Sequence, residues 1–176
     1  MKQEKIETNR LILRAFELSD AERVAILVGD KRVSDMTANI PYPYSLEMAA
    51  EWISLHKDVY VQKIALVYAI ELKDSGELIG AISFPSWTDD EAVLGYWLGV
   101  EYWGKGYMAE AGTALIDFAT AQLGIRKITA LHFVENEQSR SVIKKLGLSY
   151  IENRFDIIGG ERREVCCYEG QTERVV

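Results

Sequence analysis

The amino-acid sequence predicts an α+β fold with a mixed, mostly antiparallel sheet and elements in the order βααβββαβαββ. Two observations lead to this prediction. Three apolar segments follow one another in the middle of the chain with only short polar turns between them, as in an antiparallel meander. Helical and strand-like segments alternate only briefly after them, which is too little for a doubly wound parallel sheet. We expect about seven strands flanked by about four helices.

The first third of the chain predicts one strand and two helices. Residues 10–17, RLILRAFE, alternate in the manner of a strand. Ser19 and Asp20 offer an N-cap for a helical pattern that reaches Gly29. After a proline-containing segment, Ser45 begins the second helix.

The rest of the chain predicts the sheet and two further helices. The meander consists of IALVYAIEL, LIGAISF and AVLGYWLGV, separated by the turns KDSGE and SWTDDE. A helix from about Tyr107 to Leu123, the strand RKITALHFV and a helix ending at Gly147 follow, before the strands LSYIENRF and EVCCYE. No repeat, low-complexity tract or linker interrupts this order, so we expect residues 1–176 to form one domain.

Composition restricts the classes of function. The net charge of −7 argues against a nucleic-acid partner, which requires a basic face. The N-terminus has no apolar core of a signal peptide, and no segment has the ~18 consecutive apolar residues of a membrane span. Adjacent Cys166 and Cys167 and two distant histidines form no metal-ligand spacing. We expect a reduced cytoplasmic protein without a metal or a membrane partner.

A glycine pair between the meander and the next helix predicts an anion site. In EYWGKGYMAEA, residues 101–111, Gly104 and Gly106 lie just before the helix. Glycines allow backbone N–H groups to approach an anion, and a helix N-terminus adds partial positive charge. The stretch also fits the dinucleotide pattern G-x-G-x-x-G/A through Ala109, so its phosphate can belong to a dinucleotide or to coenzyme A. A tight turn without a ligand is the third interpretation.

The context favours coenzyme A over a dinucleotide. A dinucleotide site needs a strand that runs straight into the glycines at the start of a parallel array. Here GVEYW separates the apolar strand from Gly104, and that strand ends a meander. A dinucleotide site also has an acidic residue ~20 residues after the glycines. The acidic residue that follows here, Glu135, lies somewhat farther along the chain than that.

Four segments resemble one known family. GYWLGVEYWGKGYMAEA resembles the central motif of the GNAT superfamily of acetyl-coenzyme A-dependent N-acetyltransferases, closest to the branch of ribosomal-protein N-terminal (alanine/serine) acetyltransferases. NEQSRSVIKKLGL is similar to the branch's helix N-x-x-S-x-x-V-x-x-K-L-G-F, and TNRLILRAFELSDA and PYPYSLEMAAEWI agree as well. The resemblance covers nearly the whole chain in order and implies the GNAT fold.

Two positions depart from the superfamily pattern. The loop Q/R-x-x-G-x-G/A has Trp103 and Met108 at its ends here, and Met108 is bulkier than Gly or Ala beside a phosphate. Many members carry a tyrosine as general acid seven residues after the asparagine, where this chain has Ile143. The resemblance therefore assigns the acid role to Ser139, as in the ribosomal-protein branch.

The resemblance implies how acetyl-coenzyme A is held. Its pyrophosphate would bind backbone N–H groups of the loop, namely Trp103, Gly104, Lys105, Gly106, Tyr107, Met108 and Ala109. Its pantetheine arm would pair with the strand edge formed by Leu98, Gly99 and Val100. Asn136 and Ser139 lie three apart on one helix face, where Ser139 would lie near the sulfur and Asn136 would also cap the helix.

The implied reaction is transfer of the acetyl group to a primary amine by direct attack in a ternary complex. A protein N-terminal amine is the acceptor that the branch implies, and a small-molecule amine or antibiotic is the alternative. His132 is the candidate base, with Glu91 and Glu135 as alternatives. Tyr42, Tyr44 and Trp87 are candidates for the acceptor wall.

A competing hypothesis from another class is a non-catalytic acyl-coenzyme A-binding module. Such a module would retain Gly104, Gly106 and Asn136 but acetylate no amine. Under either hypothesis, we expect a monomer or a homodimer.

Overall fold

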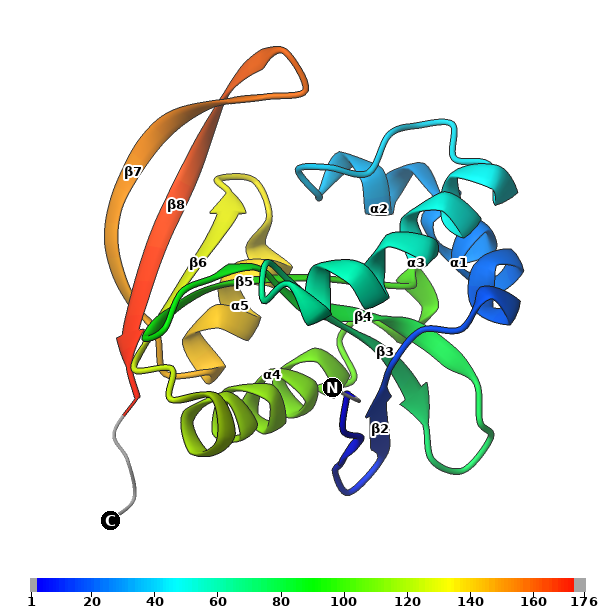
Figure 1. Cartoon of the computed structure of the whole chain (residues 1–176). Helices are drawn as coiled ribbons and strands as arrows, with labels where there is room; N and C mark the ends of the chain where they lie inside the picture. The colour runs from blue at the N-terminus through cyan, green and yellow to red at the C-terminus, as the bar shows by residue number, and fades with distance from the viewer. Residues whose placement is uncertain (1–2, 173–176) are drawn as a thin grey trace.

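The computed structural model describes residues 3–172 and shows an open eight-stranded mixed sheet with helices on both faces (Figure 1). The strand order is β1-β2-β3-β4-β5-β6-β8-β7, and β5 and β6 are the only parallel neighbours among these residues. The predicted α+β class and the mostly antiparallel sheet are therefore confirmed. The strands are β1 (Ile6–Glu7), β2 (Leu11–Arg14), β3 (Leu66–Leu72), β4 (Leu78–Trp87), β5 (Glu91–Leu98), β6 (Lys127–Phe133), β7 (Ser149–Ile158) and β8 (Glu161–Gln171).

The helices differ from the prediction in number. Within residues 3–172 the α-helices are α1 (Ala21–Val28), α2 (Lys31–Asp35), α3 (Leu46–Val61), α4 (Tyr107–Phe118) and α5 (Glu137–Lys145). The sequence prediction omitted β1 and α2, because a strand of 2 residues and a helix of 5 are too short to show an apolar period. A π-helical turn over Ala119–Leu123 continues α4, where the sequence predicted one helix.

The predicted helix caps have different outcomes. Ser45 caps α3, because its hydroxyl accepts a hydrogen bond from Met48 N at 3.2 Å. Asp20 occupies the N-cap position of α1 without capping it. Its carboxylate instead accepts hydrogen bonds from the Arg14 guanidinium at 2.8 and 2.9 Å and from Glu17 N at 2.8 Å. The acidic residue is therefore used to hold β2 against the start of the helical region.

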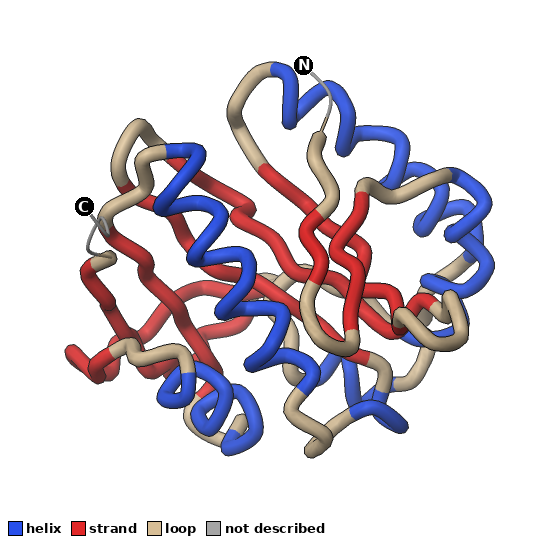
Figure 2. The backbone as a smooth tube through the Cα atoms, turned by 90° about the horizontal axis from the view of Figure 1, so that it is seen from below, coloured by secondary structure: helices blue, strands red, loops and turns tan. Residues whose placement is uncertain are grey.

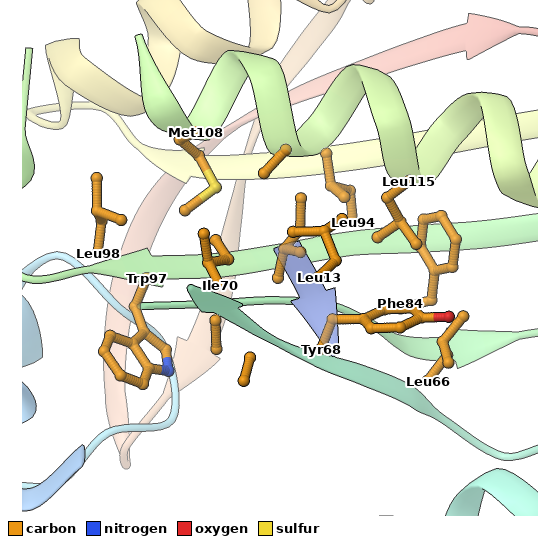
Figure 3. Packing of buried hydrophobic residues seen from close by; sticks show 14 of the residues in the cluster. Leu13, Leu66, Tyr68, Ile70, Phe84, Leu94, Trp97, Leu98, Met108 and Leu115 are labelled. Carbon is orange, nitrogen blue, oxygen red and sulfur yellow. The ribbon is translucent and has the colours of Figure 1, made fainter. Parts of the chain in front are cut away.

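The sheet has a core on each face. Seen from the α4 side, that helix lies across the strands (Figure 2). Leu115 of α4 lies near Phe84, which is 0% exposed, and Met108 lies near Leu98, whereas Trp97 lies on the other side of β5 (Figure 3). Helices α1 and α3 pack on each other and cover that other face.

The two parallel strands separate partway along their length. Residues Glu91–Leu94 of β5 pair with Lys127–Ala130 of β6, but the remainder of β6 pairs with β8 alone. The remainder of β5 pairs with β4 alone. The strands therefore diverge after Leu94, as Figure 1 shows, and leave one backbone edge of β5 unpaired. This divergence is where the pockets described next are found.

Candidate active site

A pocket of about 210 Å³ lies between the end of β5 and the N-termini of α4 and α5. The glycine loop forms one wall, and Asn136 and Ser139 of α5 form part of another. Of the predicted coenzyme residues, the lining includes Leu98, Trp103, Gly104, Gly106, Tyr107, Met108, Ala109, Asn136 and Ser139. The structure thus brings together two motifs that are more than one element apart in the sequence.

The glycine loop presents its backbone outward. Gly104 and Gly106 have φ angles of +74° and +81°, a left-handed conformation that glycine adopts without a Cβ clash. Within residues 3–172, the N–H groups of Gly104, Lys105 and Gly106 have no backbone partner. The first N–H groups of α4 have no intrahelical partner either. This donor set and the dipole of α4 suit the pyrophosphate of a coenzyme.

An ion-pair network outside the predicted site holds this loop. Arg10 donates from Nη1 to the carbonyl oxygen of Lys105 at 2.9 Å and from Nε to Glu110 at 2.7 Å. Its guanidinium also lies 4.4 Å from the ring centroid of Tyr107. The Glu110 carboxylate further accepts from the Thr8 hydroxyl at 2.6 Å and from Arg10 N at 2.8 Å. The N-terminal segment therefore fixes the loop and the first turn of α4.

Removing the centre of this network should weaken coenzyme binding. In Glu110→Ala, Arg10 loses its carboxylate partner and the loop loses its attachment to the N-terminal segment. We expect calorimetric titration to show about tenfold weaker binding of acetyl-coenzyme A. Asp156→Ala, which removes an exposed ion pair with Arg154 on β7, is the matched control and should bind normally. Unchanged affinity in Glu110→Ala would show that the network does not support the loop.

The unpaired edge of β5 begins earlier than the predicted Leu98, Gly99 and Val100. It starts after Leu94, where pairing with β6 ends. Gly99 donates to Ile79 O at 2.9 Å and accepts from Tyr102 N at 2.9 Å, so both of its backbone groups are used within the protein. A Cβ at Gly99 would lie 2.7 Å from Leu27 Cδ2. A side chain at position 99 would therefore have to displace Leu27 of α1, and Val100 already belongs to the next 3-10 turn.

The side chains of Met108, Trp103 and Lys105 in the loop lie in three different environments. Met108 is 5% exposed and packs in the core (Figure 3), so its bulk is largely directed away from the loop surface. Trp103 donates from Nε1 to Leu98 O at 2.8 Å and fastens the loop to the end of β5. The Lys105 side chain is exposed and does not line the pocket.

Ser139 forms a hydroxyl pair that the sequence did not predict. Its Oγ lies 2.6 Å from the hydroxyl oxygen of Tyr96 on β5. Asn136 caps α5 as predicted, because its Oδ1 accepts from Ser139 N at 3.0 Å. Asn136 Nδ2 also donates to Met36 O at 3.3 Å, which links α5 to the end of α2. The Asn136 cap and the hydroxyl pair together hold Ser139 in the wall of the pocket.

Tyr96 remains protonated in this position. Burial raises the pKa of its phenol to about 12, and the hydrogen bond with Ser139 opposes the rise. The phenol is therefore protonated at neutral pH, and the pair can donate a hydrogen bond. Ile143, at the position where many superfamily members carry a tyrosine, is 0% exposed in the core. Tyr96 instead brings a phenol to the site from the neighbouring strand.

A second cavity, of about 540 Å³, opens on the other side of the hydroxyl pair, and we call it the acceptor cleft. Trp97 and the residues of the pair line both spaces, so Tyr96 and Ser139 stand where the two meet. Other members of the cleft lining include Val24, Val28, Tyr44, Trp52, His56, Val67, Ala81, Leu131 and His132. They come from α1, α3, the sheet and the loop before α3.

The structure places only one of the three predicted acceptor-wall residues in this cleft. Tyr44 is part of its lining. Tyr42 is 54% exposed and outside it. Trp87 packs against Tyr60, with ring centroids 6.4 Å apart, beneath the far end of α3. The two tyrosines flank Pro43 in the sequence, but only Tyr44 reaches the cleft.

Of the predicted bases, only His132 lines the acceptor cleft. It is 5% exposed, and its Nδ1 lies 2.6 Å from Phe133 O. The carbonyl accepts only from a protonated Nδ1, so Nε2 carries the lone pair, and it lies 3.4 Å from the Tyr168 hydroxyl oxygen. Glu91 pairs with Lys127 at 3.4 Å, and Glu135 pairs with Arg163, so both carboxylates are engaged outside the cleft.

His56 is the other histidine of the cleft. It is 9% exposed on α3, and neither ring nitrogen has a hydrogen-bond partner within residues 3–172. Its ring packs edge-on against Trp52, with centroids 4.3 Å apart, and against Phe16 at 5.3 Å. Burial lowers the pKa of His56 to about 4. The imidazole is therefore neutral at physiological pH.

This buried histidine should make stability depend on pH. As the pH falls below 6.5, the unfolded chain binds a proton at His56, but the folded chain does so only near pH 4. The free energy of unfolding should therefore fall over this window, by up to about 3 kcal/mol in total. We expect His56→Phe to flatten the dependence measured by urea unfolding between pH 6.5 and about 5. Equal slopes in the two proteins would contradict a depressed pKa.

Residues 3–172 contain no group of three or more His, Cys, Asp or Glu side chains that could hold a metal ion. In the same range, no helix has both the length and the apolar character needed to cross a bilayer.

Comparisons with known proteins agree with this geometry. Residues 10–149 match the acetyltransferase (GNAT) domain family. The uncharacterized N-acetyltransferase YoaA of Bacillus subtilis (strain 168) is 30% identical over 144 residues, which cover 81% of each chain. The [ribosomal protein uS5]-alanine N-acetyltransferase of Escherichia coli (strain K12) is 25% identical over 81% of this chain and 77% of its own.

A solved structure has the same fold. The ribosomal L7/L12 alpha-N-protein acetyltransferase RimL in complex with coenzyme A superposes with a TM-score of 0.86 at 22% identity, covering 96% of this chain and 98% of that one. The family match spans most of the sequence and includes the glycine loop and α5. This chain therefore belongs to the acetyltransferase (GNAT) domain family, and it is an acetyl-coenzyme A-dependent N-acetyltransferase.

Proposed function

We propose that this enzyme acetylates the α-amine of a peptide N-terminus in a ternary complex with acetyl-coenzyme A. The observation that carries the proposal is the position of the Tyr96–Ser139 pair, which lines both the glycine-loop pocket and the acceptor cleft. A donor and an acceptor held in these two spaces would meet at a proton-donating pair without leaving the protein. Acetyl-coenzyme A, when bound, supplies an acetyl group activated as a thioester.

The chain's own residues then have separate roles. The N–H groups of the glycine loop and of the first turn of α4 hold the pyrophosphate. The unpaired edge of β5 binds the pantetheine amides as an added strand would. Ser139, in the first turn of α5 and supported by Tyr96, donates a hydrogen bond or proton toward the sulfur. His132 Nε2 accepts the proton that the incoming amine releases.

Similarity favours a peptide acceptor. The relatives include a [ribosomal protein uS5]-alanine N-acetyltransferase, and RimL is an alpha-N-protein acetyltransferase of the same fold. A small amine or antibiotic is the second candidate acceptor.

A direct assay separates these candidates. The purified protein is incubated with acetyl-coenzyme A and equal concentrations of free peptides, N-terminally blocked peptides and small amines, and thiol release and product mass are measured. We expect acetylation of the free peptides at their N-termini, and none of the blocked peptides. Turnover with small amines alone would move the acceptor to the second candidate. Tight coenzyme binding without any turnover would contradict the enzymatic proposal.

A further inference from the structure

The glycine-loop pocket has a single charged side chain among the described residues that line it. That side chain is Lys145, in the last turn of α5. Two other cations near the loop differ from it, because Arg10 is held by Glu110 and the Lys105 side chain does not line the pocket. None of the ion pairs formed within residues 3–172 includes Lys145. Its ammonium group can therefore pair with a bound anion.

The helical repeat brings Lys145 to the pocket. Ser141 and Lys145 follow Gln138 by three and seven residues, so the three side chains share one face of α5, and all of them line the pocket. Lys144 lies on a different face and does not line it. Both lysines are in the last turn of α5, where a cation interacts favourably with the helix dipole. Only Lys145 combines this interaction with a place in the pocket.

Burial changes along the α5 wall of the pocket. Ser139, at the hydroxyl pair, is 8% exposed, whereas Ser141 and Lys145 are exposed. With the thioester of acetyl-coenzyme A at the hydroxyl pair and the pyrophosphate on the glycine loop, the nucleotide end of the coenzyme is left for the exposed rim. A hydrated phosphate group suits such a rim, because it can form an ion pair there without losing all of its water.

Coenzyme A carries one phosphate that the glycine loop does not account for. This phosphate is a monoester on the 3′-oxygen of the ribose, and such a group has a charge of about −1.5 to −2 at pH 7. The net charge of the protein is −7, so its overall field repels this group unless a cation lies beside it. A lysine ammonium is a compact point charge that binds phosphate well.

We infer that Lys145 pairs with the 3′-phosphate of the coenzyme and gives the enzyme a preference for coenzyme A over carriers that lack this phosphate. The inference concerns the donor site, and it holds whichever amine is the acceptor. It assigns to the exposed end of α5 a recognition task that is separate from the proton-donating task of Ser139 at the buried end.

Calorimetric titration with coenzyme A and with 3′-dephospho-coenzyme A tests the inference. We expect the native protein to bind coenzyme A about fivefold more tightly than the dephospho form. In Lys145→Gln, the affinity for coenzyme A should fall about fivefold while that for the dephospho form stays the same, so the preference is lost. Lys145→Arg retains the charge and should keep most of the preference. Because salt screens an exposed ion pair, the preference of the native protein should also shrink at about 0.5 M salt.

Lys144→Gln is the matched control. It removes the same charge from the same turn of α5, but from a face that does not line the pocket. We expect its affinity for each coenzyme to stay within about twofold of the native value, and its preference for coenzyme A to persist. Thermal unfolding checks that all of the variants fold.

Several results would overturn the inference. One is the absence of any preference in the native protein, and another is an unchanged preference in Lys145→Gln. Equal losses for both coenzymes in Lys145→Gln would assign the lysine to the pyrophosphate instead. Equal effects of the two lysine variants would show a general effect of charge and no contact. Because these titrations contain no acceptor, a failure of peptide acetylation would leave their result unchanged.

Discussion

Gly106→Val is expected to weaken acetyl-coenzyme A binding by about a hundredfold or more while the protein stays folded. Gly106 has φ +81° at the N-cap of α4, and a β-branched residue is strained in that left-handed conformation. The nearest atom to an added Cβ is Arg10 Nη2 at 3.4 Å, so the strain changes the loop rather than the core. The backbone N–H groups that face the phosphates would then be misaligned.

Gly76→Val is the matched control for this substitution. Gly76 has φ +70° in the turn between β3 and β4, and an added Cβ there would meet nothing within 4 Å. The control should suffer the same type of backbone strain but bind acetyl-coenzyme A normally. Thermal unfolding checks that both variants fold. Retained affinity in a folded Gly106→Val protein would remove the loop from the coenzyme site.

Ser139→Ala is expected to lower kcat by about a hundredfold and to change acetyl-coenzyme A affinity by no more than about twofold. Ser139 is one of the two hydroxyls at the junction of the pocket and the cleft, whereas the proposed phosphate contacts come from the glycine loop. Its removal also leaves the Tyr96 hydroxyl without its 2.6 Å partner, which should cost about 1–3 kcal/mol of stability.

Tyr96→Phe and the double variant show whether the two hydroxyls act as one unit. If Ser139 donates the proton with support from Tyr96, the double variant should lose little more activity than Ser139→Ala alone. Ser54→Ala, which removes an exposed hydroxyl on α3, is the control and should retain full activity. Equal losses of turnover and of coenzyme affinity in Ser139→Ala would contradict the acid role.

Local sequence signals predicted those parts of the site that depend on neighbours in the chain. The glycine loop follows from Gly104 and Gly106 before a helix, and the cap of α5 follows from Asn136 and its spacing to Ser139. Such features need only a turn or one helical repeat to form. For the same reason, the order of all longer elements was predicted correctly.

Long-range contacts account for what the sequence did not predict. Tyr96 meets Ser139 across 43 residues, and Arg10 meets Lys105 across 95. No local period encodes either contact, because the first depends on how β5 and α5 pack and the second on how the N-terminal segment lies beside the glycine loop. Strand alternation places Tyr96 and Trp97 on opposite faces of β5, but the face that meets α5 becomes known only with the fold.

The divergence of β5 and β6 has a consequence for how this enzyme can change over evolutionary time. Most of the coenzyme pocket comes from residues between Tyr96 and Lys145, whereas most of the acceptor cleft comes from residues between Val24 and Trp97. The half of the chain that is proposed to bind the acetyl donor is thus largely separate from the half that is proposed to select the amine. Substitutions in the N-terminal half can retune the choice of amine while the donor-binding machinery is inherited intact, which allows one scaffold to diversify into many transferases.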